Sequence, residues 1–379
     1  MPRSDDDALS PDQVRLARQR LRAQHLVGKP LDGPAEVVRW LGAVQAQDFL
    51  GAKWAVAQRA RACTDADFEE AFARGAILRT HVMRPTWHLV APADLRWLLQ
   101  LTAPRVHALS AGYHRKLGLD AATFGRSNAA LARALQGGHR LTRSELGRVL
   151  RAGGVDDTGL RATFLILRAE LDAVVCSGGR RGKQLTYAAF DERVPATRPL
   201  RRDEALAELT RRYFLSHGPA RPQDFAWWSG LTVADARAGV AMVGADLGHA
   251  RIADQSYWFA PARATPRLAT PVVHLLPNFD EYVVAFRDHT AIFDRRLARD
   301  LGAREGLLAN HLVVLNGRVV GGWRRTLART EVVLAARLLV PFDDDARAAL
   351  DQAVERYGRF LGLRPRLVIS DARRRASPR

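Results

Sequence analysis

Three stretches of this 379-residue chain repeat one order of predicted elements, in which helices precede two short strands joined by a turn. Apolar spacing and cap signals predict the first set as helices over 10–24, 34–44 and 65–74 and strands over 77–82 and 86–90. Helix, helix, helix, hairpin is the order of a winged helix, a module that often binds DNA. Its repetition predicts tandem modules rather than one large sheet.

The second copy begins with a helix that Thr142 caps. Its remaining helix and strands are predicted over 158–171, 174–176 and 184–187. The intervening glycine-rich turn, 177–183, carries Arg180, Arg181 and Lys183. We predict that these cations contact DNA as a wing, with a solvated hairpin tip as the alternative.

The third copy starts near Asp203. Its helices and strands are predicted over 204–217, 222–228, 232–242, 248–251 and 256–259. Trp227 and Trp228 are apolar enough to be expected in a core between modules, with stacking on DNA bases as the alternative.

Beyond the proline-rich stretch 261–271 the pattern changes to strands, with Asn316-Gly317 as a strong hairpin signal. These strands are predicted over 271–276, 312–315, 318–323 and 331–339, before a helix over 344–361. The fold class is therefore α+β. The expected units are winged helix 1 over 10–92, linking helices with winged helix 2 over 93–200, winged helix 3 over 201–262, a β-rich unit over 263–365, and a basic tail over 366–379. The end of this tail, with Arg373-Arg374-Arg375 and Arg379, is expected to be disordered.

The charge of the chain indicates a polyanionic partner. Lys+Arg number 58 against 40 Asp+Glu, a net charge of +18, which favours nucleic acid. Two cysteines, Cys63 and Cys176, are too few and too far apart for a disulfide scaffold or a zinc site, and no metal or cofactor is expected. No apolar run reaches the roughly 18 residues of a membrane span, and no signal peptide is evident, so a cytoplasmic, nucleoid-associated monomer is expected.

Gln45-Ala46-Gln47 stands where the apolar helix pattern of 37–44 ends. In an extended segment, residues i and i+2 face the same way, so both amides could converge on one water or one polar ligand. The alternative is that the two glutamines cap the helix end.

Four spaced motifs carry a family resemblance: Val44 to Gln47, Arg79 to Leu89, Leu275 to Tyr282, and Asn316 to Trp323. They resemble the AlkZ/YcaQ-type winged-helix DNA glycosylases over about Asp12 to Leu361. The resemblance implies a C-shaped protein of three tandem winged helices with a β-rich C-terminal unit. It also implies excision of alkylated purines from double-stranded DNA, including those in interstrand crosslinks. The family signature of glutamine, apolar residue, glutamine or aspartate falls on Gln45 and Gln47, as in the AlkZ-like Q-x-Q branch.

Amide side chains restrict the chemistry of such a site. Glutamine cannot take a proton, but an N7- or N3-alkylated purine already carries positive charge and leaves readily. Gln45 and Gln47 could hold a water below the sugar C1′ and place partial negative charge beside the developing cation. Neither would act as a true base.

Polar residues of the first hairpin are the next candidates. Arg79 and Arg84 are expected to contact the DNA backbone. His81 and His88 could approach a phosphate or the lesion, or be buried structural residues. Trp87 alternates with Leu89 and is expected in the core.

Two further places are less specific. Arg318, at the Asn316-Gly317 turn, could probe a DNA groove or lie on an ordinary surface hairpin. Asp280 and Glu281 could be catalytic carboxylates, but a salt bridge or helix cap is the favoured interpretation.

A monofunctional glycosylase is thus the leading hypothesis. The main alternative is a non-enzymatic winged-helix regulator, although no ligand-sensing or dimerisation segment is evident. A nuclease or lyase would need an acidic metal cluster or a nucleophilic lysine, and the chain has four lysines and no acidic cluster. The residues leave open which adduct is the substrate, and whether its base is flipped out.

Overall fold

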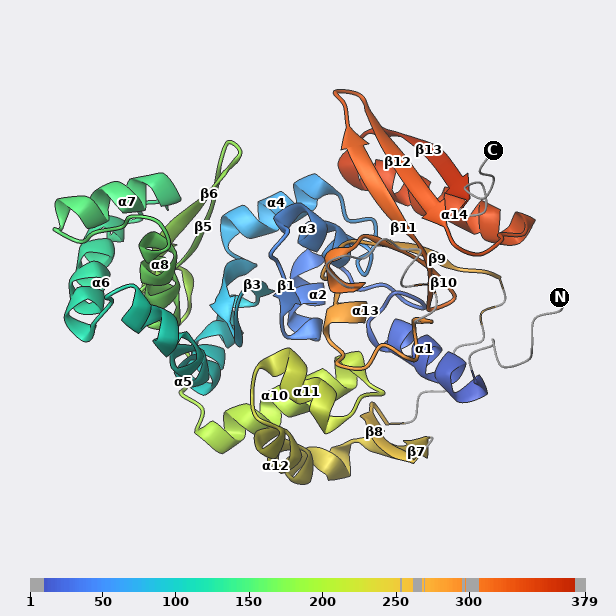
Figure 1. Ribbon diagram of the computed structural model, residues 1–379, viewed down its shortest axis with the longest axis horizontal. Coiled ribbons are helices and arrows are strands. Elements are labelled where there is room, and N and C mark those ends of the chain that lie inside the picture. Colours follow the sequence, from blue (N-terminus) through green and yellow to red (C-terminus); the bar gives the residue numbers. More distant parts are fainter. Residues whose placement is uncertain are drawn as a thin grey trace, which may run out of the picture.

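The computed structural model describes residues 10–252, 254–261, 268, 270–294, 297 and 307–371 of a mixed α+β chain (Figure 1). The first group of elements comprises α1 (Pro11–Ala23), α2 (Pro34–Leu41), β1 (Val44–Gln45), α3 (Phe49–Ala57), α4 (Asp65–Arg74), β2 (Leu78–Val82) and β3 (Arg84–Val90). Its sheet has the order β1-β3-β2. The predicted cap is confirmed, since the Ser10 side chain accepts from the N–H of Gln13.

Helix α3 has no counterpart in the predictions. Its side chains from Gly51 to Ala57 are all buried, so it lacks the polar face that marks an amphipathic helix. Trp54 reaches the C-terminal sheet, where its Nε1 donates to Leu275 O at 2.6 Å. The helix is thus buried between two parts of the chain that only tertiary structure brings together.

The second group comprises α5 (Pro92–Lys116), α6 (Ala121–Leu135), β4 (Leu141–Thr142), α7 (Arg143–Ala152), α8 (Arg161–Leu171), β5 (Val175–Arg181), β6 (Gln184–Ala189) and α9 (Phe190–Arg193). The predicted turn over 177–183 is too long, because β5 continues to Arg181 and pairs with Gln184. Gly178 sits at an irregularity of this pairing, where a Cβ would lie 2.8 Å from Thr186 Oγ1. Glycines that predict a loop here permit a bulged strand instead.

The third group comprises α10 (Arg202–His217), α11 (Pro222–Ser229), α12 (Val233–Val243), the 3₁₀ helix η2 (Gly244–Asp246), β7 (Gly248–Ile252) and β8 (Gln255–Phe259). Its predicted hairpin is confirmed by the antiparallel pairing of β7 and β8. Tyr213, Phe225 and Trp228 belong to an apolar core that also includes Val82 and Leu95. The third group is therefore packed on the first.

The C-terminal group comprises β9 (Val273–Leu276), α13 (Glu281–Val284), η4 (Leu307–Ala309), β10 (Leu312–Leu315), β11 (Arg318–Leu327), β12 (Glu331–Leu338), α14 (Asp344–Leu361) and β13 (Arg364–Asp371). Its sheet has the order β13-β12-β11-β10-β9, and β13 lies parallel to β12. Residues 366–371 of the predicted basic tail lie in β13, and the end predicted to be disordered lies within 372–379, outside the described residues. Helix α14 makes the crossover that a parallel pair requires.

Elements from separate groups meet near the centre of Figure 1, where β1, β3, α2 and α13 lie close together. The α6–α8 group lies to one side, α10–α12 lie below, and the C-terminal sheet lies above and to the other side. Gln45 is thus at a junction of the fold. None of the described helices is long and apolar enough to cross a membrane.

Candidate active site

Gln45 and Gln47 lie on an extended segment, as the Q-x-Q spacing predicts. Gln45 pairs with His88 in the sheet, and the Ala46 N–H donates to Trp87 O at 2.7 Å. Ala46 is fully buried, Gln45 is 7% exposed and Gln47 is exposed. The capping alternative is wrong, because α2 ends at Leu41 and the side chain that caps α3 is that of Asp48.

Each glutamine oxygen accepts a hydrogen bond. Gln45 Oε1 accepts from Arg84 Nη2 at 2.7 Å, and Gln47 Oε1 accepts from the Trp87 N–H at 3.4 Å. A carbonyl oxygen has two lone pairs, so both oxygens retain capacity for a water.

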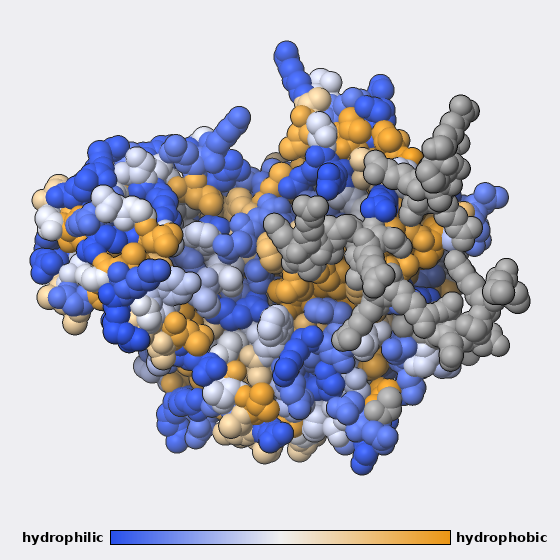
Figure 2. Space-filling model, viewed as in Figure 1, coloured by the Kyte–Doolittle hydropathy of each residue, from blue (hydrophilic) through white to orange (hydrophobic). Residues whose placement is uncertain are grey.

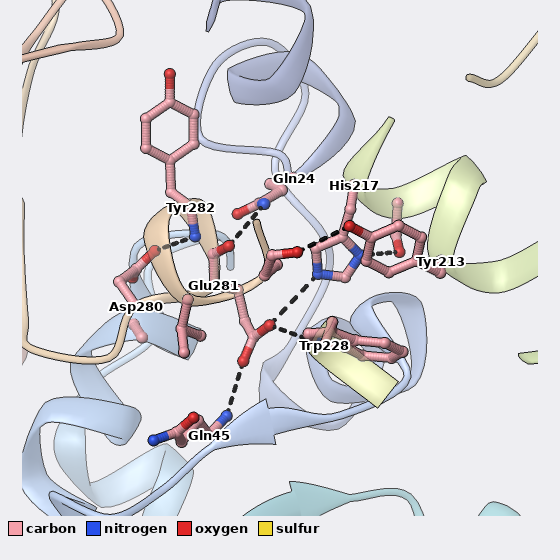
Figure 3. Close-up of polar contacts among 12 residues, drawn as sticks. Gln24, Gln45, Tyr213, His217, Trp228, Asp280, Glu281 and Tyr282 are labelled. Carbon is pink, nitrogen blue, oxygen red and sulfur yellow. Dashed lines mark hydrogen bonds and ion pairs between the residues drawn. The ribbon is translucent and has the colours of Figure 1, made fainter. Parts of the chain in front are cut away.

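Glu281 fixes the backbone behind Gln45 (Figure 3). Its Oε1 accepts from the Gln45 N–H at 2.8 Å, and its Oε2 accepts from Trp228 Nε1 at 2.9 Å. His217 Nε2 lies 3.5 Å from Oε2, and burial lowers the pKa of this histidine although Glu281 opposes the shift. Glu281 itself is 0% exposed. It cannot meet DNA, so its place in the site is to hold β1 against α10, α11 and α13.

Asp280 forms the salt bridge that the favoured interpretation predicts. Arg59 donates to both of its carboxylate oxygens, at 3.0 and 2.7 Å, and the two residues are at most 1% exposed. Arg59 also donates to Gln24 Oε1 at 2.7 Å, and Gln24 Nε2 donates to Glu281 O at 3.1 Å. The buried charges of Asp280 and Arg59 therefore support the helix that carries Glu281.

Both histidine predictions of DNA contact are wrong. His88 is 0% exposed, and burial, followed by the charge of Arg84, holds its pKa well below its ordinary value. His81 is 5% exposed, and its Nδ1 contacts the carboxylate of Glu170 on α8. Neither ring is exposed to a phosphate, because His81 is covered by α8 and His88 is buried beside Arg84 and Gln45.

Arg79 and Arg84 touch the glutamine segment directly. Arg79 Nε donates to Ala46 O at 3.1 Å, between the two glutamines. Burial lowers the pKa of both arginines. Whether they also contact phosphates stays a prediction.

The alternation with Leu89 predicts Trp87 in the core, but Trp87 is half-buried. The Arg79 guanidinium lies 4.4 Å from the centre of its ring. Both residues line a cavity of about 650 Å³ between the first hairpin and the second group, with Arg143, Ser177 and Tyr187 among the other walls. Arg79 donates to Ala46 O and the Trp87 N–H donates to Gln47 Oε1, so two residues of the cavity wall bond the Q-x-Q segment.

The three cations of the predicted wing are exposed. Arg180 is paired with Glu69 at 2.6 Å, Arg181 contacts Glu145, and Lys183 is at the turn. An exposed ion pair is weak enough for DNA to replace it. Their contact with DNA stays a prediction.

The turn before Arg318 does not project toward a groove. Gly317, at φ 90°, is buried, and its carbonyl accepts from Tyr282 Oη at 2.9 Å. Arg318 is half-buried and the turn beside it is covered by α1 and Tyr282, so Arg318 is not at a projecting tip. Its contact with a DNA groove stays a prediction. The end of the β11–β12 hairpin projects instead, with Leu327 49% exposed.

Within the described ranges, no group of three or more His, Cys, Asp and Glu is arranged to hold a metal ion. The site consists of two amides, two arginines and the buried carboxylate of Glu281. Neither arginine forms an ion pair with this carboxylate among the described residues. Such a set can position a water and tolerate a polyanion. The partly exposed carboxylate that follows it, Asp48, caps α3 and lies 3.6 Å from Arg325.

A sequence model of the DNA glycosylase AlkZ-like family matches residues 38–360. The chain belongs to the AlkZ-like family. It is 25% identical over 350 residues to an interstrand DNA cross-link repair glycosylase of Streptomyces sahachiroi, which covers 89% of this chain and 92% of that protein. Its fold is similar to the solved structure of the DNA glycosylase AlkZ of Streptomyces sahachiroi, with a TM-score of 0.77, 22% identity, and coverage of 96% of this chain and 100% of that one.

Sequence patterns did not reveal His217, Trp228 and Arg59 as partners of the site. The only available signal was the acidic pair Asp280-Glu281 in apolar surroundings, because a buried carboxylate needs donors.

Acid should destabilise this AlkZ-like chain, because its buried histidines stay uncharged in the folded state. Burial lowers the pKa of His274 from 6.5 to about 3 and that of His311 from 6.5 to about 4. The unfolded chain regains ordinary values and takes up protons, so stability falls as the pH drops below about 6.5. His274 alone should cost about 2 kcal/mol at pH 5. Urea unfolding at pH 7.5 and pH 5 measures the difference, which a His274→Gln variant should reduce; an unchanged difference would contradict the assignment.

Proposed function

We propose that this chain is a monofunctional DNA glycosylase that hydrolyses the N-glycosidic bond of N7- or N3-alkylated, cationic purines in double-stranded DNA. The observation that carries the proposal is the extended Q-x-Q segment, in which Gln45 Oε1 accepts from Arg84 Nη2 and Gln47 Oε1 accepts from the Trp87 N–H. Membership of a glycosylase family supports it. The chemistry of the substrate must then compensate for the absence of a base.

The reaction begins with a water held by the two amide oxygens. As the C1′–N bond breaks, its electron pair neutralises the purine, and the water oxygen bonds to C1′. The products are the neutral alkylated base, an abasic site and one proton released to solvent. The amide dipoles stabilise the positive charge that develops on the sugar.

We further propose that the groups described above form three winged helices and a β-rich unit, within 10–92, 93–200, 201–262 and 263–365, in a C-shaped monomer. Figure 2 shows a hollow between the lobe of β5 and β6 and the lobe of β11 and β12. Double-stranded DNA entering it would meet the wing cations on one side and Leu327 on the other. The net charge of +18 supports this partner.

The proposed function is tested with duplex DNA that contains one 7-methylguanine. After incubation and alkali treatment, strand breaks should appear at the lesion, and they should require Gln45 and Gln47. Breaks before alkali would indicate a lyase or nuclease. Sequence-specific binding with no release of any alkylated base would favour a regulator and overturn the proposal.

We propose that the cavity lined by Arg79 and Trp87 accepts large adducts, including crosslinked ones. Trp87 Nε1 has no acceptor in the described part of the chain, and the cavity volume is in the range of binding sites for drug-sized molecules. An Ala162→Trp substitution, on the cavity wall, should slow excision of 7-(pyren-1-ylmethyl)guanine about 10-fold or more and leave 7-methylguanine excision near the parental rate.

The control for this prediction is Ala129→Trp, at an exposed position of α6. Single-turnover rates on both lesions decide the matter. Equal loss on the large and the small adduct would contradict a role of the cavity in adduct binding.

A further inference from the structure

Trp227 on α11 is exposed beside the candidate active site. It is 43% exposed, whereas Trp228 is fully buried and bonded to Glu281. The expectation that both indoles lie in the core is therefore wrong for Trp227, because successive residues of a helix point in directions about 100° apart. Tryptophan is enriched at interfaces, because its indole combines a large apolar surface with one hydrogen-bond donor.

The position of this indole is fixed relative to Gln45. Trp227 Nε1 donates to Val284 O at 3.0 Å on α13, the helix whose Glu281 accepts from the Gln45 N–H. Its carbonyl also lies 3.5 Å from Arg84 Nη1, while Arg84 Nη2 donates to Gln45 Oε1 at 2.7 Å. Trp227 and Gln45 are thus both hydrogen-bonded to α13 and to Arg84.

The end of α11 is equally constrained. Gly230 has φ 72°, and a Cβ at this position would lie 2.4 Å from Met83 O, in the β2–β3 turn. Arg105 Nε donates to Gly230 O at 2.6 Å. The helix end that carries Trp227 is therefore packed on the hairpin that supports the glutamines.

The chemistry of the surroundings identifies the occupant of this surface. The only polar atom of the indole is already bonded to Val284, so its free part is an apolar π-face. Arg84 and Arg105 contact the carbonyls of Trp227 and Gly230 at this end of α11, in a chain of net charge +18, which favours an anionic partner. A ligand that combines a flat aromatic group with negative charge is a nucleotide of bound DNA.

We propose that Trp227 stacks on a base that the lesion has left without its stacking neighbour, and so positions the lesion's C1′ over Gln45 and Gln47. This inference rests on the proposed function for the identity of the DNA. Trp227 is a positioning residue, since it acts on the lesion through an adjacent base.

The test uses the full chain and duplex DNA with a tetrahydrofuran abasic analogue, which has no glycosidic bond to hydrolyse. Trp227→Ala should weaken binding of this duplex roughly 5- to 100-fold more than it weakens binding of undamaged duplex. Trp227→Phe should retain most of the affinity. The quenching of tryptophan fluorescence on DNA addition should be largely lost in both variants.

The matched control is Tyr113→Ala, which removes an aromatic side chain that is 55% exposed on α5 and should leave affinity and quenching unchanged. Parental affinity and quenching in Trp227→Ala would overturn the inference. The analogue cannot be hydrolysed, so this binding test does not depend on catalysis. If the parental protein releases no base but Trp227→Ala still weakens binding, the proposed function is overturned and the stacking inference stands.

Discussion

Gln47→Ala should lower the single-turnover rate of 7-methylguanine release roughly 100-fold, and Gln45→Ala should do the same. Each substitution removes one of the two amide oxygens that hold the attacking water, and loss of one preorganised polar group commonly costs this much. The double variant should be little worse than either single one, because two residues that hold one water act as a unit. Rates are measured at saturating DNA, by quantifying the free base.

The two positions differ in their effect on the fold. Gln47 is exposed, so its removal should leave stability unchanged, whereas removal of Gln45 leaves Arg84 without its side-chain acceptor. Gln136→Ala, at an exposed glutamine on the C-cap of α6, is the control for a general effect of amide removal. Parental rates in Gln47→Ala would remove this residue from the mechanism.

Asp280→Ala should lower the free energy of unfolding by about 3 to 5 kcal/mol, because it leaves the Arg59 guanidinium charged and buried without its partner. Arg59 is 0% exposed, and both of its hydrogen-bonded carboxylate oxygens belong to Asp280. The N-cap hydrogen bond that the Tyr282 N–H donates to Asp280 Oδ1, at 2.9 Å, is lost as well. Urea unfolding at pH 7.5 measures the change.

Asp12→Ala is the control, since Asp12 forms an exposed ion pair with Arg15 and should change stability by less than about 1 kcal/mol. A loss below about 1 kcal/mol in Asp280→Ala would show that the buried pair does not stabilise the fold. Excision by the folded fraction of Asp280→Ala should also fall, because α13 carries the Glu281 that holds β1.

Local signals were sufficient for much of the fold. Thr142 and Thr232 each cap a helix whose third residue is acidic. Asn316-Gly317 forms its hairpin with both residues at positive φ. These features depend on a few neighbouring residues. Long-range pairings were out of reach: Gln45 and Glu281 are 236 positions apart, and His81 and Glu170 are 89 apart.

The errors have the same physical origin. Strand β13 is rich in arginine, and it joins the sheet only because α14 returns the chain beside β12. Trp227 and Trp228 are adjacent and identical in type, yet one is exposed and the other is fully buried. The alternation of 86–90 placed Trp87 in the core, but the second group leaves a cavity against it. Composition cannot decide such cases, because burial depends on what the rest of the chain places opposite each side chain.

The pH dependence of single-turnover 7-methylguanine release, with DNA binding saturated, tests the central claim most directly. Glutamine does not titrate, and the buried His88 beside Arg84 has a pKa held well below its ordinary value by desolvation. The account therefore predicts a rate that is nearly flat from about pH 6 to pH 9. A rate that falls tenfold per pH unit below an apparent pKa near 6.5 would contradict it, because a titrating base rather than the Gln45–Gln47 pair would then activate the water.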